Sequence, residues 1–127
     1  TGREGFVSSK RLHENLDVWQ KAIELSVLIY NVTAKLPDSE KFGLCSQMRR
    51  AAVSVGSNIA EGAARGTTNQ YIHFLYLARG SLAELDTQTE ICRRLKYFDQ
   101  ATYDHIMGLT ETVGRMLTNL IKSLKAK

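Results

Sequence analysis

The chain has 127 residues, of which 43% are hydrophobic and only one is proline, and its formal net charge is +4. A chain of this length and composition is expected to fold as one globular domain with a substantial core, and the mild basic excess is compatible with nucleic acid without requiring it. With no apolar run near the ~20 residues of a membrane helix and no signal-peptide pattern, we expect a cytoplasmic protein without a membrane partner.

Residues 1–15 contain two glycines and several charges without a period, which predicts a flexible N-terminal arm ahead of a single folded domain at 16–127. The first helix is expected from about residue 17 to 35, with Asp17 as its N-cap and Gln20 in the capping-box position. Its apolar band contains Trp19, Ala22, Ile23, Ser26, Ile29 and Tyr30, widened by Val18, Leu25, Leu28 and Val32. A band this wide predicts burial on more than one side, as in a bundle or an oligomer.

Residues 38–43 are expected to form a connector with one short helical turn, in which Phe42 packs back onto the core. The second helix is expected at about 44–63, with Gly62 and Gly66 marking its C-terminal cap. Its small residues, among them Gly56, predict a close approach of another helix, because glycine inside a helix costs about 1 kcal/mol relative to alanine.

The third helix is expected at about 68–95, with Thr67 and Gln70 as its capping box, and the fourth at about 100–124, capped by Asp99. The three- and four-residue spacing of apolar side chains continues through both, and Lys122 and Lys125 suit the negative end of the last helix dipole. Four amphipathic helices with short connectors predict an all-α, antiparallel up-down four-helix bundle.

Three stretches are distinctive: LDVWQKAIELSVLIY at 16–30, GLCSQMRRAAVSVGSNIAEGAARG at 43–66 and YIHFLYLARGSLAELDTQTEICRRLKY at 71–97. In these stretches the chain resembles the four-helix-bundle family associated with intervening sequences in large-subunit ribosomal RNA genes. That family is similar to the accessory protein of diversity-generating retroelements, which forms a five-fold barrel and binds nucleic acid and a reverse transcriptase. The resemblance implies a bundle fold, a homopentamer, RNA or a reverse transcriptase as partners, and no enzymatic activity.

A polar line along the second helix suggests a structural network. Its members recur at helical spacing, and an acidic residue of the third helix is placed level with its beginning; the network comprises Gln47, Arg50, Ser54, Asn58, Glu61 and Glu84. We expect Arg49 or Arg50 to pair with Glu84 or Glu61, across the hairpin or between subunits, and so to fix helix register.

Basic side chains of the second and third helices are the candidates for RNA binding through phosphate contacts, namely Arg49, Arg65, Arg79, Arg93, Arg94 and Lys96. The alternative for such an edge is an ordinary solvated face, in which case the protein is a structural or protein-interaction scaffold without a nucleic-acid role.

Catalytic and metal-binding patterns are missing from the sequence. His13, His73 and His105 have no partner at metal-ligand spacing, Ser54 and Ser57 have no nearby base, and Cys45 and Cys92 are expected to be separate thiols. We therefore expect a protein that is not an enzyme and has neither a cofactor, nor a metal, nor a small-molecule substrate.

Overall fold

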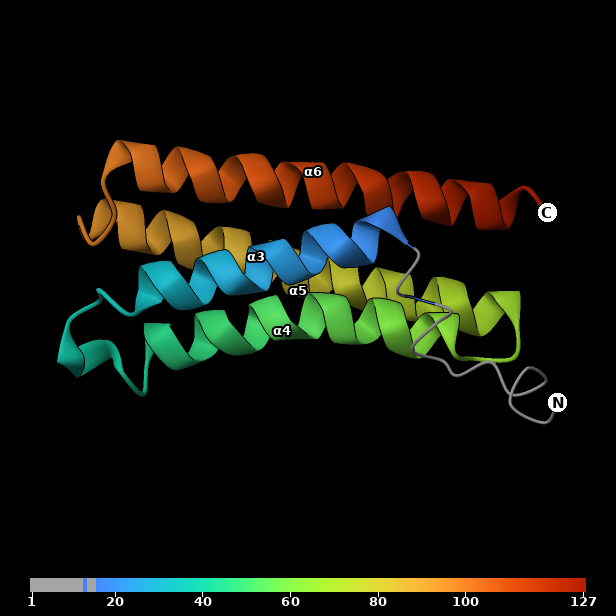
Figure 1. The fold of residues 1–127 in the computed structure, drawn as a ribbon, viewed down its shortest axis with the longest axis horizontal. Coiled ribbons are helices and arrows are strands. Elements are labelled where there is room, and N and C mark those ends of the chain that lie inside the picture. The colour runs from blue at the N-terminus through green and yellow to red at the C-terminus, as the bar shows by residue number, and fades with distance from the viewer. Residues whose placement is uncertain (1–12, 14–15) are drawn as a thin grey trace, which may run out of the picture.

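The computed structural model describes residue 13 and residues 16–127, so the predicted arm at 1–15 lies, apart from His13, outside the described residues. The elements are α3 (Asp17–Thr33), the 3-10 turn η1 (Asp38–Glu40), α4 (Leu44–Ala63), α5 (Thr68–Arg94) and α6 (Gln100–Lys125). Successive helices run in opposite directions (Figure 1). Each helix packs against two neighbours in the order α3, α4, α5, α6 and back to α3. The predicted antiparallel up-down four-helix bundle is confirmed.

Two of the three predicted helix N-caps are present. The Thr67 hydroxyl accepts a hydrogen bond from the Gln70 backbone N–H at 3.2 Å, and the Asp99 carboxylate accepts one from the Thr102 N–H at 2.7 Å. The predicted Asp17 cap is wrong, because Leu16 is the N-cap of α3 and makes no side-chain hydrogen bond. Asp17 is instead the first residue of the helix, where its charge still favours the positive end of the helix dipole.

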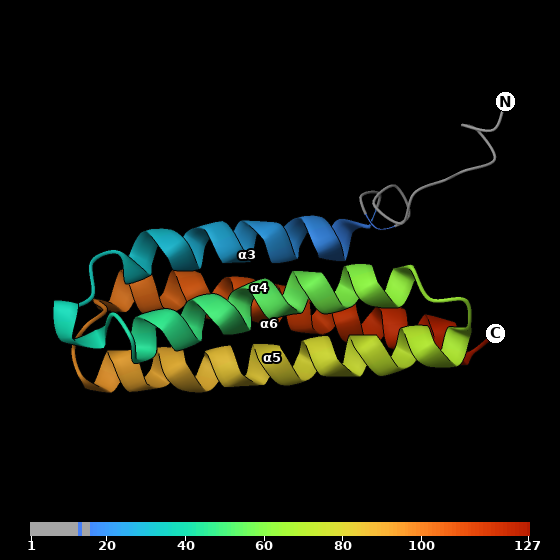
Figure 2. The same cartoon turned by 90° about the horizontal axis from the view of Figure 1, so that it is seen from below.

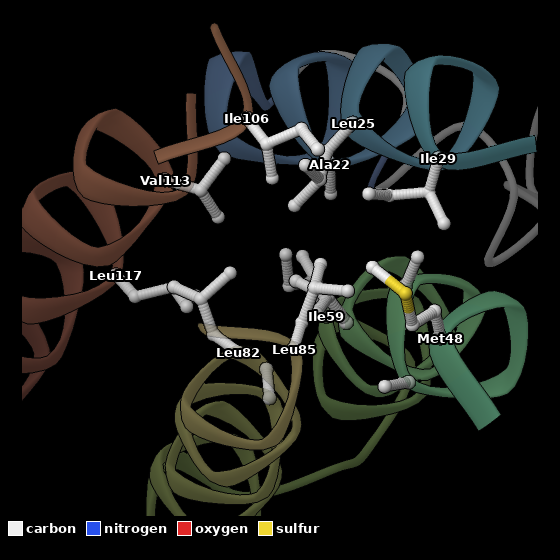
Figure 3. Close-up of a cluster of buried hydrophobic side chains, with 14 of the residues drawn as sticks. Ala22, Leu25, Ile29, Met48, Ile59, Leu82, Leu85, Ile106, Val113 and Leu117 are labelled. Carbon is white, nitrogen blue, oxygen red and sulfur yellow. The ribbon is translucent and has the colours of Figure 1, made fainter. Parts of the chain in front are cut away.

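The core lies along the bundle axis, where side chains of all four helices meet (Figure 3). Helix α3 contributes Val18, Ala22, Leu25 and Ile29, all of them buried. Trp19, Leu28 and Val32 are partly buried and pack against the core, whereas Ile23 is 40% and Tyr30 45% exposed. Part of the apolar width predicted for this helix therefore faces outward.

Close packing between helices depends on Gly62 rather than on Gly56. A Cβ added at Gly62 would lie 2.9 Å from the Phe74 Cβ and 3.2 Å from the Tyr71 carbonyl oxygen, whereas at Gly56 the nearest atom, the Ile23 Cδ1, would be 3.6 Å away. Gly62 lies inside α4 and its φ is not positive, so the predicted cap at this residue is also wrong. Its role is to let α5 approach α4.

Phe42 does not pack back onto the core as predicted. Its side chain is 87% exposed in the connector between η1 and α4. The connector is held through Glu40, whose carboxylate accepts hydrogen bonds from the Leu44 N–H at 3.3 Å and from the Tyr97 hydroxyl at 3.0 Å. Glu40 therefore caps α4 and also joins the α3–α4 connector to the α5–α6 connector, which lies at the same end of the bundle (Figure 1).

Candidate functional site

Charge is distributed unevenly along the chain. Residues 62–83 and 112–127 contain no Asp or Glu and carry the six basic residues Arg65, Arg79, Arg115, Lys122, Lys125 and Lys127. Residues 16–61 and 84–111 together carry eleven acidic and eight basic residues. The up-down topology brings the second half of α6 beside the first half of α5, so the two acid-free stretches lie at one end of the bundle (Figure 1).

Side-chain spacing places four of these cations, together with Tyr76, on one surface. We call it the α5–α6 basic face, and it consists of Tyr76, Arg79, Arg115, Lys122 and Lys125. On α6, Lys122 follows Arg115 by seven residues and Lys125 follows by three more, so all three share one helix face. Arg79 lies one turn after Tyr76 on the adjacent helix. Both arginines and both lysines are exposed.

Tyr76 is the point where the two helices meet on this face. The Lys125 ammonium donates a hydrogen bond to the Tyr76 hydroxyl at 2.6 Å and lies 5.2 Å from the ring centroid, and the Arg79 guanidinium lies 5.1 Å from the same centroid. The hydrogen bond from Lys125 lowers the pKa of Tyr76, and the charges of Lys125 and Arg79 act in the same direction. Within residues 16–127, none of the four cations forms an ion pair with a carboxylate. The face therefore presents uncompensated positive charge around an exposed aromatic ring.

Three of the predicted RNA-binding residues are already paired with carboxylates. Arg93 and Arg94 both donate to Glu90, the latter at 2.8 Å, and Tyr103 donates to the same carboxylate at 3.0 Å. These hydrogen bonds, that of Arg93 first, lower the pKa of Glu90 to about 2. Arg65 pairs with Glu61 one helical turn earlier, at 3.2 Å.

The other predicted basic residues have different surroundings. Arg49 donates from Nε to the Thr33 hydroxyl at 2.9 Å and from Nη2 to the Tyr30 carbonyl at 3.3 Å, so it joins α4 to α3. Lys96 is exposed in the α5–α6 connector. Of the predicted set, only Arg79 lies on the α5–α6 basic face.

The predicted polar line divides into an inner and an outer part. Ser54 and Ser81 are hydrogen-bonded between α4 and α5 at 2.9 Å, and the Asn58 amide donates to the Ser54 hydroxyl at 3.0 Å. Ser81 is a member that sequence reasoning did not include. The remaining members, Gln47, Arg50, Glu61 and Glu84, are exposed. Within the described residues, Arg49 contacts α3 instead of a carboxylate, and Glu61 pairs with Arg65.

Sequence reasoning missed Arg115, Lys122 and Lys125 as site residues. The position of Lys122 and Lys125 suits the negative end of the helix dipole, but the dipole does not explain the missing acidic residues around them. The signal that identifies the face is the lack of Asp and Glu in two stretches that an up-down bundle must place side by side.

Three further possibilities for the described part of the chain are a metal site, a reactive thiol and a membrane-spanning helix. Residue 13 and residues 16–127 contain no group of three or more His, Cys, Asp or Glu side chains arranged to hold a metal ion. Cys92 donates to the Met48 sulfur at 3.6 Å, and burial raises the pKa of its thiol to about 11, so it is protonated at neutral pH. Across the same residues, no helix is both long and apolar enough to cross a membrane.

Comparisons with known proteins give the family. No curated protein matches the sequence significantly. The crystal structure of a protein of unknown function from the S23 ribosomal protein family of Bacteroides thetaiotaomicron is 26% identical and matches 83% of this chain and 95% of that chain, with a TM-score of 0.77. The family model of the 23S rRNA-intervening sequence protein matches residues 14–119. The chain belongs to the 23S rRNA-intervening sequence protein family.

Proposed function

We propose that this protein is a non-catalytic, oligomeric accessory protein of the cytoplasm that associates with structured RNA through the α5–α6 basic face. The observation that carries the proposal is the group of four cations without carboxylate partners around Tyr76. The family description refers to 23S rRNA, and the solved relative is assigned to a ribosomal protein family, which supports RNA over another polyanion.

The chemistry of the face suits phosphate contacts more than base recognition. Arg79 provides a planar guanidinium that binds phosphate oxygens in a bidentate manner, and Lys122 and Lys125 act as point charges. The Tyr76 ring is contacted by Arg79 and Lys125, so its role is to hold these cations in place rather than to stack on a base. The face contains no Asp or Glu that could accept a hydrogen bond from the amino group of a base. We therefore expect it to recognise the shape and charge of RNA with weak sequence preference.

The decisive experiment replaces Arg79, Lys122 and Lys125 together by Gln and compares the variant with Arg93→Gln/Arg94→Gln. We expect the triple variant to bind a structured ribosomal RNA fragment at least about tenfold more weakly in fluorescence anisotropy, with a shallower salt dependence, because each lost phosphate contact removes a slope of about 0.7–0.9. The matched double variant should change Kd less than about threefold, because both guanidinium groups are held by Glu90, which compensates one of their two charges.

Two results would contradict the proposal. One is undetectable binding by the wild-type protein at about 50 mM salt, where phosphate contacts are strongest. The other is an equal loss of affinity in the triple and double variants, which would make binding a property of total charge rather than of this face.

A second candidate function is a protein-interaction scaffold, favoured by the apolar surface that α3 and α4 leave exposed. Self-assembly makes RNA association and protein interaction compatible functions. The family resemblance implies a homopentamer, and such an assembly would repeat the basic face several times. Multivalent contacts raise affinity without any new contact within a subunit.

A further inference from the structure

The outer side of α3 and α4 contains a groove that the bundle does not fill. We call it the α3–α4 groove; its volume is about 800 Å³, and its lining includes Tyr30, Phe42, Cys45 and Val53. The exposed fractions of Tyr30, Phe42 and Val53 are 45%, 87% and 44%. These three large apolar side chains are exposed on one side of the bundle, and a partner that covers them removes apolar surface from water, which is favourable.

The groove has a single sign of charge. Lys41, Arg49 and Arg50 lie along it, and no Asp or Glu is among the residues that line it. The Lys41 ammonium lies 5.6 Å from the Phe42 ring centroid, and the Arg49 guanidinium lies 4.6 Å from that of Tyr30. The groove therefore suits a partner surface that is apolar and acidic at once.

Such a surface is present on α5 of the same chain. We call it the α5 stripe; it consists of Leu77, Glu84, Ile91 and Leu95, which follow one another at steps of seven, seven and four residues and so share one helix face. The three apolar side chains are 44%, 42% and 51% exposed. Glu84 is exposed between them and takes part in no ion pair within residues 16–127.

We propose that the α5 stripe of one copy docks into the α3–α4 groove of the next, with Glu84 facing Arg50, so that copies assemble head to tail. This inference rests on the self-assembly part of the proposed function and assigns its two surfaces. The lengths are compatible, because the stripe from residue 77 to 95 extends about 27 Å and the groove residues on α4, from 45 to 57, extend about 18 Å, with Phe42 of the preceding connector adding to the groove. Helix α4 lies between α3 and α5 (Figure 2), and the groove and the stripe share no residue, so one copy presents both surfaces at once.

Electrostatics disfavour the simpler symmetric contacts. Groove against groove would bring Lys41 and Arg50 of two copies together, and stripe against stripe would oppose the two Glu84 carboxylates. Like charges at an interface cost affinity, whereas the head-to-tail contact pairs opposite ones. A heterologous contact of this kind closes into a ring when the rotation between copies allows it.

A protein fits this groove better than RNA does. Val53 and Cys45 offer aliphatic and thiol surface, which gains stability only when another apolar surface removes it from water. The Tyr30 and Phe42 rings are each already approached by a cation of the same chain. The α5 stripe supplies apolar side chains that cover the groove and a carboxylate that pairs with its basic residues.

The test uses one blocking substitution on each surface, Val53→Asp in the groove and Ile91→Asp in the stripe, with Ala101→Asp on exposed α6 surface as the matched control. We expect light scattering to show an assembly of three or more chains for the wild type and the control, and a monomer for each blocked variant. Circular dichroism should show the same helix content in all four proteins, because every substituted position is exposed.

Mixing the two blocked variants tests whether the groove of one copy binds the stripe of another. Each retains the surface that the other has lost, so the mixture should form a complex of two chains and nothing larger. A monomeric or dimeric wild type, an Ile91→Asp variant that assembles normally, or a mixture that stays monomeric would each overturn the inference. RNA binding is measured separately, so an assembled wild type that binds no RNA removes the proposed function and leaves this inference standing.

Discussion

Gly62 allows α4 and α5 to approach each other closely, since a Cβ there would meet the Phe74 Cβ at 2.9 Å. We predict that Gly62→Ala lowers the free energy of unfolding by about 1–3 kcal/mol, because the added methyl forces the helices apart. Gly108→Ala is the matched control; its Cβ meets nothing within 4 Å. It should raise stability by about 0.5–1 kcal/mol through reduced chain entropy. Urea denaturation measures both, and a neutral Gly62→Ala would contradict the close-packing role.

Glu90 gives the stability a defined acid dependence. Its pKa is about 2 in the folded protein, compared with 4.5 ordinarily, because Arg93, Arg94 and Tyr103 donate to the carboxylate. A carboxyl whose folded pKa is depressed stabilises the fold fully above its unfolded pKa and progressively less as the pH falls towards the folded value. The contribution of Glu90 should therefore be lost between pH 4.5 and about 2.

The measurement is the melting temperature of the wild type and of Glu90→Gln at about pH 6 and about pH 3. We predict a larger decrease for the wild type than for the variant, because only the wild type has this carboxylate to protonate. Part of the dependence should remain in the variant, since the hydrogen bonds from Thr102 also lower the pKa of Asp99. Equal decreases in both proteins would contradict the assignment.

At the scale of the elements, helix α5 ends in a Schellman motif without glycine. The Tyr97 N–H donates to the Cys92 carbonyl at 2.8 Å and the Lys96 N–H to the Arg93 carbonyl at 3.0 Å, while Lys96 has a φ of 64°. This left-handed conformation is unfavourable for a residue with a Cβ by about 1–2 kcal/mol. The sequence shows a helix end here but not the conformation, because lysine is not a residue that signals it.

We predict that Lys96→Gly raises the free energy of unfolding by about 0.5–1 kcal/mol, the relief of the left-handed strain being partly offset by the greater chain entropy of glycine. Lys96→Ala removes the same charge but keeps the Cβ, so it should bring no such gain. Thermal or urea unfolding of the two variants decides between strain and charge. A gain of equal size in Lys96→Ala would show that the charge, not the backbone, was responsible.

The helices were predictable because local signals agree with the three- and four-residue apolar spacing. Thr67 and Asp99 cap their helices as predicted, and α4 spans the predicted residues 44–63. The errors concern side chains whose environment depends on tertiary contacts. Phe42 looks like a core residue in sequence but is 87% exposed, and Gly62 resembles a cap but serves helix packing. Hydrophobicity alone does not distinguish a core face from an exposed one.

At the scale of the molecule, the basic set predicted from sequence and the α5–α6 basic face share only Arg79. Counting cations identified Arg93 and Arg94, but the structure pairs both with Glu90. What matters is the charge left after local pairing, and that depends on which helices are neighbours. The topology, which was predictable, together with the two acid-free stretches would have located the face.

Assembly and RNA binding should be coupled if both proposals hold. Val53→Asp leaves the α5–α6 basic face unchanged but is expected to produce monomers. We therefore predict that this variant binds structured RNA on the order of tenfold more weakly than the wild type, because it loses multivalent attachment. Anisotropy titration with Ala101→Asp as the control measures the effect. Equal affinity in the monomer would show that one basic face is sufficient.

The hydrogen bond between Glu40 and Tyr97 has a consequence for how the bundle opens. It ties together two connectors that are 57 residues apart in sequence, at the end opposite the turn between α4 and α5. Opening the connectors at this end must break this hydrogen bond, whereas within residues 16–127 the α4–α5 turn at the opposite end is not joined to a second connector. Amide hydrogens near the connectors should therefore exchange with solvent more slowly than those near residue 66. The basic face lies at the end where amide hydrogens exchange faster, so a bound polyanion should slow amide exchange most at this end.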